Sequence, residues 1–230
     1  MYLLLPHSTP LLAPRRINIG GTCAAIADYL EVLQTLATDY FETGLTRDAE
    51  AICFAAMKYT FALGIPYCAI SLALIERGEP VYGVVYDFSR RLLMHGGPGF
   101  GVHDGERLAR VTAEEPNPEM LVGFHSPNDK SLVPAADAVL SHFKIRGLGS
   151  ATLHLAYVAA GMFGGAVDFN VKIWDLAAAI ALLRGAGGEI IFLNGAQLPM
   201  RTFDLRMARI IYVAGSPAMA LRLAGLVAAR

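Results

Sequence analysis

The sequence predicts a layered α/β fold in which an antiparallel sheet is followed by a mixed sheet. Two runs rich in Val, Ile and Tyr, residues 67–76 and 81–88, are joined by a Gly- and Pro-containing turn, which is typical of a β-hairpin. The glycine-rich segment 91–111 predicts that this hairpin continues as a meander. After residue 118, short apolar runs alternate with helical patterns, as expected for α/β layers.

The remaining elements follow from apolar periodicity and from start and stop signals. Strands are expected over residues 120–125, 143–149, 164–169, 189–193 and 209–215, with a turn at residues 194–195. Helices are expected over residues 22–39, 46–58, 131–143, 150–161, 175–185 and 217–228. We expect a single unit with an antiparallel-sheet half, residues 1–120, and a mixed α/β half, residues 121–230.

Composition restricts the class of protein and its partners. Of the 230 residues, 54% are hydrophobic and 17% charged, which indicates an extensive core or a buried interface, and we expect a homodimer. The net charge of -1 and the lack of a basic tract argue against nucleic acid as a partner. The prolines near the N-terminus and the glycines of the longest apolar run argue against a signal peptide and a membrane span. The three cysteines lack zinc-type spacing, so a cytoplasmic protein is expected.

Four segments, in order, resemble the inositol monophosphatase family from about residue 61 to the end: "GIPYCAISLALIERGEPVYGVVYD", "LGSATLHLAYVAAG", "WDLAAAIALLRGAGGEI" and "VAGSP". The resemblance implies a five-layer αβαβα sandwich with antiparallel and mixed sheets, usually dimeric. It also implies an enzyme that acts on small phosphomonoesters with magnesium, which needs clustered carboxylates as oxygen ligands.

The family's metal-binding carboxylates come from a Glu-Glu pair, from the motif Asp-Pro-Ile/Leu-Asp-Gly-Thr, and from the Asp of Trp-Asp. Only the last is present, as Asp175. Counting back from Gly64 places Cys53 and Ala56 where the motif has its two aspartates, and Met57 and Lys58 where it has Gly-Thr. Because one carboxylate does not organise a magnesium cluster, neither a metal site nor a cofactor is predicted.

The downstream side of the family's pocket is better preserved. Gly149, Ser150 and Ala151 match a turn that contacts substrate, and Asp168 matches an acidic residue that binds a substrate hydroxyl. Lys172 could pair with either carboxylate or with an anionic ligand. For Asp175 two interpretations stay open, a helix N-terminal residue that accepts backbone amides or a retained metal-binding or catalytic group.

These patterns predict a protein that has lost magnesium-dependent phosphatase chemistry. Its pocket would bind a small molecule and serve metal-independent chemistry in a specialised biosynthetic pathway, with Asp175 or Asp168 as general acid/base and Lys58 or Tyr59 as electrostatic partner. The alternatives are a non-catalytic pseudophosphatase that binds a ligand or partner protein, and a weak magnesium-dependent phosphomonoesterase.

The remaining reactive side chains have simpler interpretations. Cys53 is either a small buried hydrophobe or a nucleophile helped by Lys58. The histidines lack metal-pair spacing and are expected at the surface or in the core, although His95 and His103 flank the glycine-rich hairpin and could project together.

Overall fold

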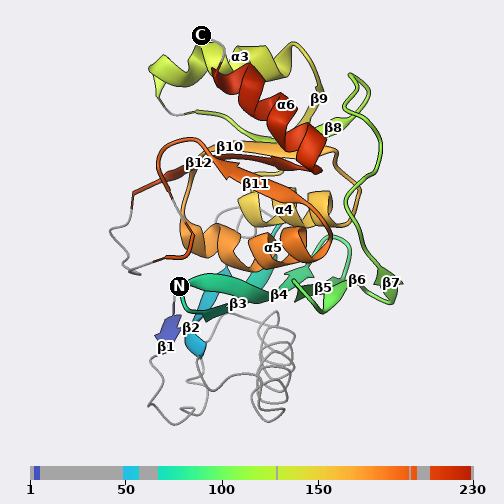
Figure 1. Cartoon of the computed structure of the whole chain (residues 1–230), viewed down its shortest axis with the longest axis vertical. Coiled ribbons are helices and arrows are strands. Elements are labelled where there is room, and N and C mark those ends of the chain that lie inside the picture. The colour runs from blue at the N-terminus through green and yellow to red at the C-terminus, as the bar shows by residue number, and fades with distance from the viewer. Residues whose placement is uncertain are drawn as a thin grey trace, which may run out of the picture.

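The computed structural model describes residues 67–127, 129–196, 198–200 and 208–228, together with the path of two further strands, β1 (Leu3–Leu5) and β2 (Ala49–Ala56). These residues form two sheets with helices between them and on one outer side (Figure 1). The helix expected over residues 22–39 lies outside the described residues, as do Lys58 and Tyr59.

The first sheet is antiparallel and has seven strands in chain order, β1 to β7. The predicted hairpin and meander are confirmed, and the glycine-rich segment turns between β5 and β6 with no helix after it. The strands that follow β2 are β3 (Ala69–Glu76), β4 (Glu79–Asp87), β5 (Leu92–Gly97), β6 (Gly101–Asp104) and β7 (Arg107–Leu108).

The helix predicted over residues 46–58 is wrong, because this segment contains strand β2. Its register with β3 places Cys53 opposite Ala73. Pairing with a neighbouring strand satisfies the backbone hydrogen-bonding groups along the segment, and this tertiary pairing outweighs a local helical pattern. Cys53 is therefore a strand residue and not part of a helix face.

The second sheet is mixed and has five strands in the order β11-β12-β10-β8-β9. Strand β8 is parallel to β9 and to β10, whereas β12 is antiparallel to β10 and to β11. This agrees with the mixed sheet expected after residue 118. The strands are β8 (Leu121–His125), β9 (Lys144–Arg146), β10 (Gly165–Val171), β11 (Glu189–Phe192) and β12 (Ile210–Gly215).

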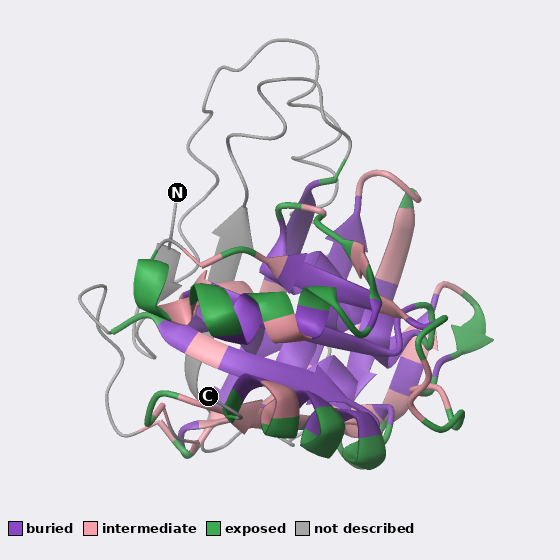
Figure 2. Ribbon diagram, turned by 90° about the horizontal axis from the view of Figure 1, so that it is seen from above, coloured by how far each residue is buried: buried purple, intermediate pink, exposed green. Residues whose placement is uncertain are grey.

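Helices separate and cover the sheets in alternating layers, as the predicted sandwich requires. Helices α4 (Ala151–Ala159) and α5 (Ile173–Gly185) lie between the sheets, and α4 is buried at every position. Helices α3 (Val133–Leu140) and α6 (Pro217–Ala228) cover the other face of the mixed sheet and expose their outer sides (Figures 1 and 2). None of the helices in the described ranges is long and apolar enough to cross a membrane.

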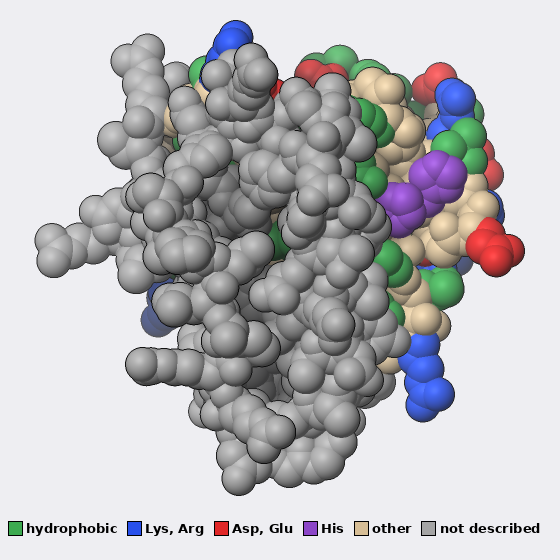
Figure 3. All heavy atoms as spheres, turned by 90° about the horizontal axis from the view of Figure 1, so that it is seen from below, with side chains coloured by type: hydrophobic (Ala, Val, Ile, Leu, Met, Phe, Trp, Pro, Cys, Tyr) green, Lys and Arg blue, Asp and Glu red, His purple; other side chains and the backbone are tan. Residues whose placement is uncertain are grey.

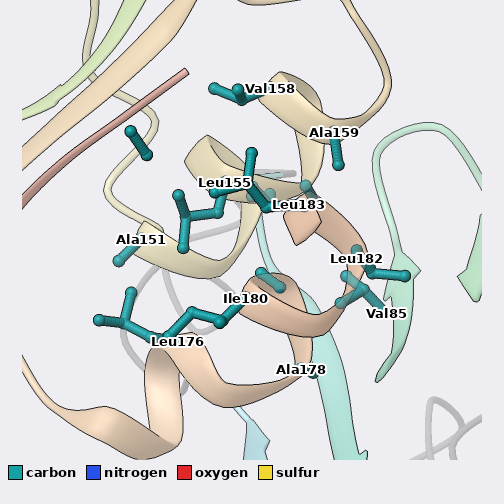
Figure 4. Close-up of a cluster of buried hydrophobic side chains, with 14 of the residues drawn as sticks. Val85, Ala151, Leu155, Val158, Ala159, Leu176, Ala178, Ile180, Leu182 and Leu183 are labelled. Carbon is teal, nitrogen blue, oxygen red and sulfur yellow. The ribbon is translucent and has the colours of Figure 1, made fainter. Parts of the chain in front are cut away.

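Helix α5 packs closely on the antiparallel sheet because a strand glycine lies beneath it. A Cβ atom at Gly83 would lie 2.0 Å from the carbonyl oxygen of Ala178, so the helix reaches this position only over glycine. On its other side α5 contacts α4 through aliphatic side chains, each of which stabilises the fold by about 2 kcal/mol when fully buried. Figure 4 shows this shared core, which includes Leu155, Leu176, Ile180 and Leu183.

Candidate functional site

Polar side chains converge where strands β8 and β10 end and helices α4 and α5 begin. The sheet register places three of them in one row, since Asp168 of β10 lies opposite His125 of β8 and Tyr212 of β12. Ligands of open α/β sheets commonly bind outside the carboxyl ends of parallel strands. We call this region, with the first turns of α4 and α5, the carboxyl-edge site.

Asp168 lies at the centre of a buried hydrogen-bond network. His154 Nδ1 is 3.0 Å from its Oδ1, and the Tyr212 hydroxyl donates to its Oδ2. The Leu148 amide donates to His154 Nε2 over 3.1 Å, which assigns the ring proton to Nδ1 and makes that nitrogen the donor to Asp168. Gly123 of β8 leaves room for this ring, because a Cβ there would lie 2.9 Å from two side-chain atoms of His154. The network fixes the Asp168 carboxylate in the protein interior.

Burial alone would raise the pKa of the Asp168 carboxyl, but its ring partners outweigh that effect. The electrostatic effect and hydrogen bond of His154, the bond from Tyr212 and the electrostatic effect of His125 together hold the pKa below its ordinary value. The side chain of Asp168 is 0% exposed. In this conformation neither carboxylate oxygen reaches the surface, and the two roles expected for Asp168, contact with a substrate hydroxyl and general acid/base chemistry, stay predictions.

Asp175 occupies the third position of α5 and is half-buried. Its Oδ2 accepts the Lys172 amide over 3.2 Å, so the side chain reaches back to cap the helix start. Burial raises the pKa of this carboxyl, although the backbone bond and the charge of His125 act against the increase. The capping interpretation is thus confirmed, while the half-buried carboxylate remains at the carboxyl-edge site.

The turn matched to the substrate-contacting segment leads into α4. Gly149 has φ +70° and is exposed, a backbone conformation that favours glycine, and Ser150 caps the helix by accepting the Leu153 amide over 3.3 Å. Ala151 is buried as the first helical residue. The Thr152 hydroxyl donates to the Asp175 carbonyl over 2.7 Å, which joins the first turn of α4 to that of α5.

Lys172 is the N-cap residue that immediately precedes α5. Its ammonium lies 5.6 Å from the centre of the Trp174 ring, within the range of a cation–π contact. Its charge also lowers the pKa of Asp175, so the ammonium is near enough to influence that carboxylate. The predicted pairing of Lys172 with an anionic ligand stays a prediction.

The sequence did not single out His125, which the structure brings to the same place. Its side chain is 39% exposed, and its Nδ1 is 4.0 Å from Asp168 Oδ1. That nitrogen is buried and has no hydrogen-bond partner among the described residues. In the sequence, His125 stands at the end of a short apolar run, which places it at a strand end. Its pairing with Asp168 follows only from the register between β8 and β10.

The described side chains of the carboxyl-edge site do not form a set of magnesium ligands. Magnesium takes near-octahedral oxygen ligands and usually retains several waters around one or two carboxylates. Within the described ranges, no three histidine, cysteine, aspartate or glutamate side chains converge as metal ligands would. Asp175 is half-buried, whereas both oxygens of Asp168 accept hydrogen bonds from other side chains. The described residues therefore do not fit a magnesium site.

Two other features involve residues that the sequence did not predict for the site. A hollow of about 170 Å³ lies beside the start of α5, lined by residues that include Ile173, Phe192 and Arg209. On the antiparallel sheet, His95 and His103 stack with ring centres 5.2 Å apart, so they do project together, and Figure 3 shows histidine side chains gathered on one face of the molecule. Neither feature includes a residue predicted for the site.

The sequence is similar to known phosphatases along most of the described chain. A model described as the inositol monophosphatase family matches residues 59–229. The chain is 38% identical to "Nus factor SuhB" of Xylella fastidiosa over 59% of this chain and 52% of that protein. It is 36% identical to "Inositol-1-monophosphatase" of Rhizobium meliloti over 61% of this chain and 55% of that protein. It is 33% identical to "Fructose-1,6-bisphosphatase/inositol-1-monophosphatase" of Thermococcus kodakarensis over 68% of this chain and 60% of that protein. The chain spans about half the length of the curated relatives it matches.

Solved structures show the same fold. The SuhB protein of Bartonella henselae superposes with a TM-score of 0.65 at 29% identity, over 74% of this chain and 65% of that one. An IMPase of Thermotoga maritima superposes with a TM-score of 0.62 at 25% identity, over 73% of this chain and 63% of that one. The predicted layered sandwich is thus confirmed.

The prediction of a lost phosphatase activity, with the pocket repurposed for metal-independent chemistry, is contradicted. Several relatives at 33–38% identity are named inositol-1-monophosphatase, fructose-1,6-bisphosphatase/inositol-1-monophosphatase or Nus factor SuhB, and none of these names describes a repurposed protein without phosphatase activity. The prediction rested on residues 53–58 and on the missing Glu-Glu pair upstream of them, both of which precede the matched range, whereas Asp168 and Asp175 lie within it.

Proposed function

Because the chain belongs to the inositol monophosphatase family, we propose that it hydrolyses phosphomonoesters of small polyols. The observation that carries the proposal is the family match over residues 59–229, which includes Asp175 at the amino end of α5. The names of the relatives support the substrate class, since inositol and fructose are both rich in hydroxyl groups.

The first turn of α5 combines features that suit a phosphate ester. The amino end of a helix carries partial positive charge and favours anions, and the Lys172 ammonium lies at the same end. In hydrolysis, water attacks phosphorus, the ester P–O bond breaks, and the leaving alcohol oxygen gains a proton. Asp175 is the group we assign to hold a proton of the attacking water, because a carboxyl with a raised pKa is a better proton acceptor.

The other site residues support this position. The hydroxyl of Thr152 ties α4 to the Asp175 backbone, and the exposed Gly149 places an open backbone segment next to the same helix end. We assign the turn at residues 149–151 to substrate contact through its backbone, because the side chain of Ser150 points inward as the helix cap.

Assembly and location are further parts of the proposal. We propose a cytoplasmic homodimer whose partner is a small molecule, supported by the high hydrophobic content and by exposed apolar side chains such as Phe100 and Leu108. Light scattering of the purified chain at two concentrations would test the dimer, and a monomer at both would contradict it.

Phosphate release from glycerol 2-phosphate, with magnesium and with a chelator, tests the function. Asp175→Asn is expected to lower kcat/KM by about 100-fold, the usual scale for loss of a proton-transfer group, with little change in Tm because the amide oxygen can still cap the helix. The matched control is Asp137→Asn on the exposed side of α3, which should keep full activity. Release no faster than a protein-free blank in both conditions would refute the proposal.

A further inference from the structure

A row of polar side chains crosses β8, β10 and β12 at the carboxyl-edge site. Asp168 in the middle is fully buried, and Tyr212 on one side is buried as well. His125 on the other side is the member of the row that reaches solvent, with 39% of its side chain exposed. The row thus connects a fixed interior carboxylate to a ring at the surface of the carboxyl-edge site.

The ring of His125 has one buried edge and one open edge. Its Nδ1 is buried and faces Asp168 Oδ1 at 4.0 Å, too far for a hydrogen bond but close enough to form one after a small shift. A carboxylate oxygen accepts two hydrogen bonds, so Oδ1 can take His125 in addition to His154. Because Nδ1 is on the buried side, the exposed part of the ring carries Nε2.

The open edge of His125 shares its surroundings with Asp175. The two side chains are near enough to interact electrostatically, since a positive charge on this ring would lower the pKa of that carboxyl. When Nδ1 donates to Asp168, Nε2 has a lone pair and accepts hydrogen bonds. An exposed acceptor at Nε2 suits a ligand that carries a hydroxyl group.

We propose that His125 is a substrate-binding residue whose Nε2 accepts a hydrogen bond from a hydroxyl of the polyol, with Asp168 as the positioning residue that orients the ring. The proposal rests on the proposed phosphomonoesterase function and assigns the hydroxyl-bearing part of the substrate to the end of β8. The negative charge of Asp168 beneath the ring favours a neutral hydroxyl over a phosphate at this position.

The test compares two substrates that differ only in hydroxyl groups, glycerol 1-phosphate and propyl phosphate. His125→Ala is expected to raise KM for glycerol 1-phosphate about five- to tenfold, the scale of one hydrogen bond, and to change KM for propyl phosphate less than about twofold. His125→Gln should recover part of the loss, because its amide reaches the place of Nε2. His142→Ala, at an exposed histidine after α3, is the control and should change neither value. Equal changes for both substrates, or no change, would overturn the proposal.

A binding measurement separates this inference from the proposed function. Adding myo-inositol to the wild-type chain should shift the ring ¹⁵N resonances of His125 and leave those of His142 in place. If the chain released no phosphate but these resonances shifted, the phosphatase proposal would fail and the hydroxyl site would stand. If the His125 resonances did not move, the hydroxyl site would fall whatever the activity.

Discussion

Two buried aspartates, Asp87 and Asp168, have the same exposure and one similar partner but different surroundings. Both are 0% exposed, and each accepts a tyrosine hydroxyl, from Tyr157 over 2.6 Å at Asp87 and from Tyr212 at Asp168. The other partners of Asp87 belong to the turn that follows β4, namely the Ser89 amide and hydroxyl at 2.9 and 2.7 Å and the Arg90 amide at 3.2 Å.

Asp168 instead receives a ring nitrogen of His154 and has the half-exposed His125 beside it. Asp87 holds the backbone of the turn after β4 and joins the first sheet to α4, so its hydrogen bonds stabilise the fold. Asp168 fixes side chains at the edge where both inner helices begin. The comparison indicates that a buried carboxylate is better interpreted from the groups it orients than from its burial.

The largest effect is expected when Asp87 is removed. Asp87→Ala leaves two turn amides and a buried tyrosine hydroxyl without their acceptor, so the free energy of unfolding should fall by about 3 kcal/mol. Urea denaturation measures this loss. KM of the folded fraction should stay near that of the wild type for either substrate, and a selective rise for glycerol 1-phosphate would remove the distinction between the two aspartates.

A smaller, functional effect is expected at Asp168. Asp168→Asn keeps an oxygen for His154 and the size of the side chain, but it removes the charge that orients His125. KM for glycerol 1-phosphate should rise about fivefold while KM for propyl phosphate is unchanged, as for the loss of one oriented hydrogen bond. Steady-state kinetics measure both values. If His125→Ala abolished the effect of Asp168→Asn in the double variant, the two residues would act together; independent, additive effects would contradict the positioning role.

Most elements of the described fold could be predicted because their signals are local. Helix α6 begins and ends where the sequence indicated, and the hairpin of β3 and β4 follows from two apolar runs and their turn. Strand β2 could not be predicted in the same way, because its conformation depends on pairing with β3, and that partner is separated from it in sequence.

The site residues differ in the same way, because some have local sequence signals and others depend on sheet register. The position of Asp175 at a helix start and the turn at residues 149–151 follow from short sequence matches, and the structure places both in the first turns of neighbouring helices. The burial of Asp168 and the approach of His125 depend on the register between β8 and β10, which no local pattern specifies. Lys58 and Tyr59 lie outside the described residues, so their predicted role stays a prediction.

The smallest expected effect is the pH dependence of folding stability, which has opposite directions for Asp168 and Asp175. The pKa of Asp168 is lowered in the folded chain, so its contribution to stability is present above its unfolded pKa, about 3.9, and is lost as pH falls through the folded value. The pKa of Asp175 is raised, so its contribution is complete below the unfolded pKa and is lost as pH rises through the folded value.

Urea denaturation from about pH 3 to 7 measures these contributions by comparing the wild type with Asp168→Asn and Asp175→Asn. The stability advantage of the wild type over Asp168→Asn should grow as pH rises, and its advantage over Asp175→Asn should shrink, because asparagine does not titrate. Two differences with the same slope would mean that both carboxyls experience the same net environment. If the stability difference between the wild type and Asp168→Asn alone did not change with pH, the partners of Asp168 would only offset the effect of burial on its pKa. The proposal that Asp168 orients His125 would then lose its electrostatic basis.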